Sequence, residues 1–142
     1  MKLSETIYYA CFPDYLRRVP PNCFSEVDDY ESAWEFSKPF DFIHGRSLSG
    51  SVKDFPMLFQ RVKNNLKPGG WVELVDIPIN FFSDDATEEN APNIMEWVRL
   101  QIEATVKFGK EMDITHKYKQ WLIDAGFTNV QEDIYKVCFQ AI

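Results

Sequence analysis

Residues 40–77 read FDFIHGRSLSGSVKDFPMLFQRVKNNLKPGGWVELVDI, and this stretch decides the fold class. It holds two short apolar runs, residues 40–44 and 71–77, on either side of a segment with helical spacing. Runs of this length beside glycines are typical of buried strands, whereas apolar residues repeating every four positions indicate an amphipathic helix. The stretch therefore predicts a strand, a helix and a second strand.

The central helix is predicted over residues 54–66. Asp54 is a suitable N-cap, and Pro56 falls in the first turn, where a missing backbone N–H does no harm. Leu58, Val62 and Leu66 lie on one face of this helix. The following Lys-Pro-Gly-Gly, residues 67–70, is predicted to stop the helix and turn the chain into the next strand.

The flanking sequence predicts further helices and strands in the order of an α/β domain. Working outward, we expect a short helix over residues 3–15 and a short strand over 23–28. We also expect a long helix over 92–108, with Ile94, Val98, Ile102, Thr105 and Val106 on its apolar face. A helix over 115–125, with Tyr118, Trp121 and Leu122 inward, and a last strand over 130–139 are expected to follow. The 142 residues are predicted to form one domain.

Charge and composition exclude several classes of partner. The net charge is −7, and no run of lysine and arginine supplies the basic surface that nucleic acid or an anionic membrane requires. The partners left are a small-molecule substrate or another protein. Three scattered cysteines and two histidines predict neither a disulfide framework nor a metal site. No signal peptide or membrane span is evident, and a cytoplasmic location is expected.

Three stretches carry a family resemblance: VPPNCFSEVDDYESAWEF (19–36), residues 40–77, and WLIDAGFTNV (121–130). Together they resemble the LaeA-like fungal methyltransferases, a branch of the class I SAM-dependent fold. We place the family-like core at residues 19–137 and leave residues 1–18 unmatched. The resemblance implies an α/β fold, a Rossmann-like parallel sheet with flanking helices.

The sequence departs from this family in its glycines. The family carries a glycine-rich GxGxG loop that lets the backbone approach SAM, but the glycines here, at 45, 50, 69, 70, 109 and 126, never stand in GxG spacing. Asp28 and Asp29 match the family's acidic pair, in which one carboxylate faces the adenine of SAM; without the glycine loop, we expect them to lie in a solvated turn. We therefore expect a methyltransferase-like chain that is truncated at both ends and uses no cofactor.

A sheet shortened in this way would expose strand edges. We expect a homodimer to complete the sheet; a rearranged sheet and a non-functional gene fragment are the alternatives.

Candidate catalytic residues follow from the strand ends, where open α/β sheets bind their ligands. His44 and Arg46 come just after one predicted strand, and Asp76 comes near the end of the next. A histidine beside a carboxylate can transfer protons, and an arginine can stabilise an oxyanion. The alternative is structural: His44 and Arg46 bond local backbone, and Asp76 caps a turn.

Four further residues are candidates for substrate binding. Tyr8 and Tyr9 can line a pocket, or else belong to a core or an interface. Trp71 and Glu73 share one face of a predicted strand, and Glu73 is either a buried, perturbed carboxylate or the partner of an arginine.

Three functions remain open from the sequence. The first is a cofactor-independent cyclase or isomerase that acts on a small apolar oxygenated metabolite in fungal secondary metabolism. The second is a regulatory pseudo-methyltransferase that binds a full-length relative. The third is a SAM-dependent methyltransferase whose site is rebuilt in a dimer.

Overall fold

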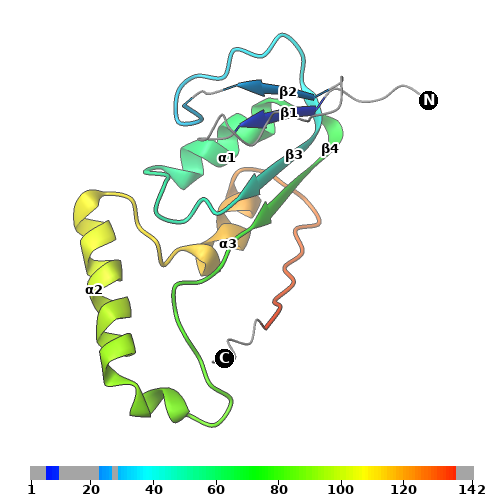
Figure 1. Cartoon of the computed structure of the whole chain (residues 1–142). Coiled ribbons are helices and arrows are strands. Elements are labelled where there is room, and N and C mark those ends of the chain that lie inside the picture. Colours follow the sequence, from blue (N-terminus) through cyan, green and yellow to red (C-terminus); the bar gives the residue numbers. More distant parts are fainter. Residues whose placement is uncertain (1–5, 10–22, 27–28, 137–142) are drawn as a thin grey trace. The chain divides into compact units, whose positions relative to one another are not determined.

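The computed structural model describes residues 6–9, 23–26 and 29–136 (Figure 1). The chain forms two compact units, residues 1–32 and 33–142. The first unit contains β1 (Thr6–Tyr9) and β2 (Cys23–Glu26). The second contains β3 (Phe40–Arg46), α1 (Phe55–Asn64), β4 (Leu66–Val75), η2 (Thr87–Asn90), α2 (Pro92–Phe108), η3 (Thr115–Lys117) and α3 (Tyr118–Asp124). The expected α/β fold with parallel strands is confirmed.

The first unit is built on a parallel pair of strands. β1 and β2 run in register from Thr6 opposite Cys23 to Tyr9 opposite Glu26. The helix expected over residues 3–15 is therefore wrong at Thr6–Tyr9, where β-branched and aromatic residues favour a strand once a neighbour is present. The rest of that helix lies outside the described residues. The strand expected over 23–28 is confirmed for Cys23–Glu26.

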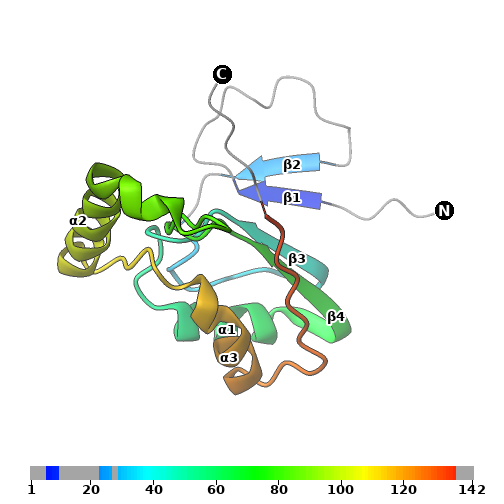
Figure 2. The ribbon, with the colours of Figure 1, turned by 90° about the horizontal axis from the view of Figure 1, so that it is seen from below.

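The second unit is built on a β–α–β connection. β3 and β4 are parallel, and α1 joins them and packs against β4 and α3. Figure 2 shows α1 and α3 on the same side of the β3–β4 pair. The helix begins as expected, because the Asp54 carboxylate accepts a hydrogen bond from the Met57 N–H at 2.9 Å.

Two strand boundaries differ from the sequence prediction. β3 continues to Arg46, because Gly45 and Arg46 pair with Leu74 and Val75. His44 and Arg46 therefore lie inside the strand and not beyond it.

The second boundary is the start of β4. β4 begins at Leu66, so the Lys-Pro-Gly-Gly turn is part of the strand. Phe40 pairs with Leu66 and Phe42 with Trp71, so the register shifts in between. Gly69, with φ of +80°, makes that irregularity feasible.

The core lies between α1 and α3. Phe55, Leu58, Phe59 and Val62 of α1 are buried at the predicted helical spacing. Phe55 stacks on Trp121 with ring centroids 5.6 Å apart, and Phe59 meets Tyr118 edge-on at 5.8 Å. The helix expected over 115–125 is confirmed as η3 followed by α3, with Tyr118 buried and Trp121 and Leu122 partly buried.

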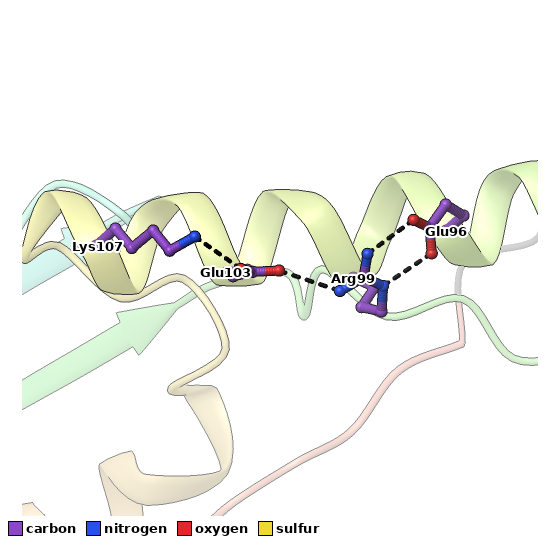
Figure 3. A network of polar contacts seen from close by, with 4 residues as sticks. All are labelled: Glu96, Arg99, Glu103 and Lys107. Carbon is purple, nitrogen blue, oxygen red and sulfur yellow. Dashed lines mark hydrogen bonds and ion pairs between the residues drawn. The ribbon is translucent and has the colours of Figure 1, made fainter.

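α2 has the predicted bounds but only part of the predicted burial. Val98 is 3% exposed, whereas Ile94 and Val106 are 50% and 54% exposed, so the expected inward face is wrong at these two positions. The helix ends at Gly109, with φ of +79°. Its charged side carries a continuous network in which Arg99 contacts Glu96 and Glu103, and Lys107 contacts Glu103 (Figure 3).

The strand expected over 130–139 is wrong for residues 130–136, which form neither strand nor helix. A strand needs a neighbour that takes its backbone hydrogen bonds, and none pairs with this segment in the described part of the chain. Residues 137–139 lie outside the described residues. No described helix combines the length and the apolar character needed to cross a membrane.

Candidate functional site

A histidine and a glutamate face each other across the two strands of the second unit. His44 on β3 and Glu73 on β4 are register partners, and His44 Nδ1 lies 2.8 Å from Glu73 Oε2. Their side chains are 42% and 59% exposed, respectively. The sequence left two alternatives for Glu73, a buried carboxylate or the partner of an arginine, and the structure shows neither: the carboxylate is exposed and pairs with an imidazole.

Two further cross-strand pairs flank this one on the same side of the strands. Phe42 pairs with Trp71, and Arg46 pairs with Val75. Side chains two residues apart on a strand share a face, so all six point the same way. We call this surface the open face, made of Phe42, His44, Arg46, Trp71, Glu73 and Val75. Phe42 is 53% exposed, Trp71 71% and Val75 44%.

The open face brings together groups that are chemically suited to proton transfer and aromatic rings. Glu73 accepts a hydrogen bond from Nδ1–H in the tautomer that leaves His44 Nε2 free to take a proton. The permanently charged Arg46 side chain lies two residues further along the same strand, and its guanidinium has no hydrogen-bond or ion-pair partner among the described residues. The Phe42 and Trp71 rings supply flat apolar surface beside these groups.

Asp76 lies in a different set of contacts from His44 and Arg46. Its Oδ2 accepts hydrogen bonds from the Leu48 and Ser49 N–H groups, both at 2.9 Å, and from the Tyr118 hydroxyl at 2.9 Å. These contacts fit the structural alternative, a carboxylate that holds the loop after β3. The catalytic role of Asp76 stays a prediction, and the carboxylate beside His44 is that of Glu73.

The surroundings of Tyr118, including the contact with Asp76, shift the pKa of its hydroxyl. Burial of its ring, together with the negative charge of Asp76, raises the pKa of the Tyr118 hydroxyl well above its usual value of 10.0. The phenol stays protonated at neutral pH and donates its proton to the Asp76 carboxylate. The pair joins α3 to the end of β4.

The remaining candidates are divided between the two units. Trp71 and Glu73 lie on the open face of the second unit, next to His44. Tyr8 and Tyr9 lie in β1 of the first unit, opposite Ser25 and Glu26. Phe42 and Val75 were not predicted. Their spacing of two residues from His44 and Glu73 would have identified them, because both lie within the strands predicted from the sequence.

The acidic pair that the family resemblance implies for SAM binding is only partly covered by the described residues. Asp28 lies outside them, and both carboxylate oxygens of Asp29 bind the local turn, at Glu31 N–H and the Ser32 hydroxyl. The described glycines do not form a GxG loop that could approach a cofactor. No group of three or more His, Cys, Asp or Glu side chains among the described residues could hold a metal ion.

Two shallow surface grooves lie apart from the open face. One, of about 260 Å³, is lined by Phe81, Phe82, Ile94 and Met95 among others, near the start of α2. The other, of about 440 Å³, lies where Met57 and Gln60 of α1 approach Trp121 of α3. His44 and Glu73 line neither of these grooves.

Parallel strands joined by a helix define an α/β protein of the Rossmann-like type, and the candidate side chains lie toward the carboxyl ends of the strands. Residues 10–132 match the family described as "Methyltransferase domain". The chain belongs to this methyltransferase family, and its curated relatives identify it with the LaeA-like fungal branch, as the sequence predicted.

Three relatives illustrate the branch. Methyltransferase pytC of Aspergillus terreus is 34% identical over 119 residues, which cover 84% of this chain and 37% of the relative. Probable methyltransferase tdiE of Emericella nidulans is 36% identical, covering 78% and 34%. The secondary metabolism regulator LAE1 of Cochliobolus heterostrophus is 34% identical, covering 84% and 40%.

The chain spans little more than a third of the length of these relatives. The similarity is therefore to one segment of each. No solved structure matches the chain significantly.

Proposed function

We propose that this chain is a methyltransferase-family enzyme of fungal secondary metabolism that acts by acid–base catalysis, without SAM, as a cyclase or isomerase. Its substrate is a small apolar oxygenated metabolite. The observation that carries the proposal is the 2.8 Å contact between His44 Nδ1 and Glu73 Oε2 on a face that also presents Arg46 and two aromatic rings.

Each group on the open face has a role in such a reaction. His44 Nε2 takes a proton from a carbon next to a carbonyl, and Glu73 stabilises the imidazolium that results. Arg46 stabilises the negative charge that develops on the carbonyl oxygen. The imidazolium then returns the proton to a different carbon, so the reaction is an isomerisation with no net gain or loss of atoms. Phe42 and Trp71 hold the apolar part of the substrate.

A fungal strain that lacks this chain, complemented with variants, tests the proposal through its metabolite profile. His44→Gln removes the titrating group, and we expect a loss of the pathway product of at least about tenfold, because general acid–base catalysis contributes about 10²–10⁴ in rate. His116→Gln is the matched control, since His116 is also an exposed histidine, 3.9 Å from a carboxylate. We expect the product to be unchanged in the control.

Two further variants test the separate roles of Glu73 and Arg46. Glu73→Gln keeps the size of the side chain but removes the charge that stabilises the imidazolium, so the product should fall less than with His44→Gln. Arg46→Lys keeps the positive charge but loses the planar set of N–H donors of the guanidinium group. A strain in which His44→Gln makes as much product as the wild type would overturn the enzymatic function.

A regulatory role is the second candidate, and two observations favour it. The open face is a surface that a partner could cover, because Trp71 and Phe42 are more than half exposed. Relatives of this chain are named as secondary metabolism regulators. In this case the chain binds a full-length relative as a pseudo-methyltransferase. Trp71→Glu should then abolish co-purification with the relative, while His44→Gln should leave the regulated metabolites unchanged.

Family membership favours a third candidate, a SAM-dependent methyltransferase whose site is rebuilt in a dimer. Calorimetric titration of the purified chain with SAM separates it from the first two. Micromolar binding, equivalent to about −8 kcal/mol, would support methyl transfer. Absence of heat from a folded sample would leave the open face as the functional surface.

A further inference from the structure

α2 presents a row of apolar side chains to solvent. Trp97, Leu100, Ala104 and Phe108 follow each other at intervals of three, four and four residues, so they lie along one side of the helix. We call this row the α2 stripe. Trp97 is 52% exposed, Leu100 49% and Phe108 76%. The helix has 17 residues and is about 25 Å long, so the stripe runs along most of it.

The α2 stripe is separate from the side of the helix that packs within its own unit. Val98 is 3% exposed, and Ile102 and Thr105, which share its side, are partly buried. The helix thus has two apolar sides, one covered and one open. An open row of large apolar side chains is unusual on a protein surface unless another surface covers it.

The charges beside the α2 stripe indicate what covers it. Glu96 and Lys107 border Leu100, four residues before it and seven after. Along the helix the charged side chains of Figure 3 alternate in sign: Glu96, Arg99, Glu103, Lys107. On an α-helix Arg99 and Glu103 project more than about 90° from the centre of the stripe, so Glu96 and Lys107 are the charges at its border. In an antiparallel pair the same border of both helices meets, so Glu96 of one copy lies opposite Lys107 of the other.

We propose that the α2 stripe is a self-association surface, on which a second copy of this chain docks with its α2 antiparallel. Glu96 then faces Lys107 of the partner subunit, and Lys107 faces Glu96 of the partner subunit. Leu100 lies at the level of the small Ala104 of the partner subunit, which allows the two helices to approach closely. The two helix dipoles oppose each other, which adds to the attraction.

This surface is distinct from the strand edges through which a dimer was expected from the sequence. It does not depend on the proposed acid–base function, since no residue of the open face takes part. The two copies are related by a two-fold axis, so each interaction occurs twice.

Sedimentation of the purified chain over a range of concentrations tests the interface. We expect a dimer for the wild type and a monomer for Leu100→Glu, which puts a charge at the centre of the stripe. Met57→Glu is the matched control: Met57 is an exposed apolar residue of α1, 48% exposed, and its replacement should leave the mass unchanged. Circular dichroism of each variant verifies that the helices remain folded.

A charge exchange tests the antiparallel direction. Glu96→Lys and Lys107→Glu should each raise the dimer dissociation constant at least about tenfold, because like charges then meet twice. The double variant E96K/K107E should restore dimerisation, because the opposite charges again face each other. The contacts within one helix do not predict this rescue, since each single change breaks a different ion pair there.

Three outcomes would overturn the proposal. One is a folded wild-type chain that remains monomeric at all concentrations. Another is a dimer that Leu100→Glu does not disrupt, which would place the contact elsewhere, for example at the strand edges. The third is a double variant no better than the single ones, which would exclude the antiparallel pairing.

Discussion

The Tyr118 hydroxyl donates a hydrogen bond of 2.9 Å to the Asp76 carboxylate, across a sequence separation of 42 residues. The same carboxylate oxygen accepts the backbone N–H groups of Leu48 and Ser49. One side chain at the end of β4 thus fixes the loop after β3 and the first turn of α3. Because that loop follows directly on the open face, the position of His44 and Arg46 depends on a residue that does not contact them.

Asp76→Asn should destabilise the second unit. The amide has no charge and only one oxygen, so the three hydrogen bonds to Oδ2 lose their charge-assisted character or their acceptor. We expect the free energy of unfolding to fall by about 1.5–3 kcal/mol, measured by urea denaturation.

Asp41→Asn is the matched control for that measurement. Asp41 pairs with Lys67 at 2.7 Å, but its side chain is 74% exposed, so water takes over most of the interaction. We expect little change in stability. Equal losses of unfolding free energy for the two variants would mean that the Asp76 contacts stabilise the fold no more than an exposed ion pair does.

The raised pKa of Tyr118 predicts an alkaline loss of stability. The folded state holds the phenol proton more tightly than the unfolded state, whose tyrosine pKa is about 10. This contribution is complete below pH about 10 and is lost as the pH rises further, because the unfolded state then binds fewer protons. Tyr118→Phe should have a smaller decrease in unfolding free energy between pH about 9 and 11. Tyr135→Phe, at a side chain 83% exposed, should keep the wild-type slope.

Replacement by alanine should have unequal effects on stability at two glycines that have similar φ angles. Gly50 has φ of +75°, and a Cβ there would lie 2.6 Å from Met112 Cγ. Gly69 has φ of +80° and open space around it. Gly69→Ala should cost about 1 kcal/mol from backbone strain alone. Gly50→Ala should cost about 1–3 kcal/mol more. Thermal unfolding measures both, and adding Met112→Ala should reduce the difference; an unchanged difference would argue against the steric explanation.

Phe59 should be the most sensitive core position of α1. Its side chain is 0% exposed and contacts the rings of Phe55 and Tyr118. Phe59→Ala should cost about 3–5 kcal/mol, which is much of the stability of a small domain. Met57→Ala on the same helix should change little, since Met57 is 48% exposed. Phe59→Leu, which keeps most of the volume, should remain folded by circular dichroism; unfolding of all three would point to α1 as a whole.

Local signals in the sequence were sufficient to predict the bounds of the helices. Asp54 and Pro56 determine where α1 begins, and Gly109 and Gly126 determine where two other helices end, because each acts within one turn of its own position. The bounds of α2, Pro92–Phe108, were predicted to the residue for the same reason. The covered side of α2 was predicted only in part: Val98 and Ile102 lie on it, but Ile94 and Val106 are exposed, because burial depends on what packs against the helix.

The strands were less predictable. Residues 67–70 have the composition of a turn, yet β3 pairs on both sides of them and draws them into β4. Thr6–Tyr9 has a spacing compatible with a helix, yet it forms a strand beside β2. Residues 130–136 have the apolar composition of a strand and form none. In each case the outcome depends on whether a neighbouring strand accepts the backbone hydrogen bonds, and that neighbour is distant in the sequence.

The sequence by itself determined the α/β class, the family, the β–α–β connection and the identity of His44, Arg46, Trp71 and Glu73 as candidate residues. Periodicity, helix caps and motifs are local properties, so they can be read without a structure. Only the tertiary structure decided that His44 pairs with Glu73 while Asp76 binds Tyr118 and the loop after β3. The register of two parallel strands sets which carboxylate meets the imidazole, and a register is fixed by packing across the whole unit.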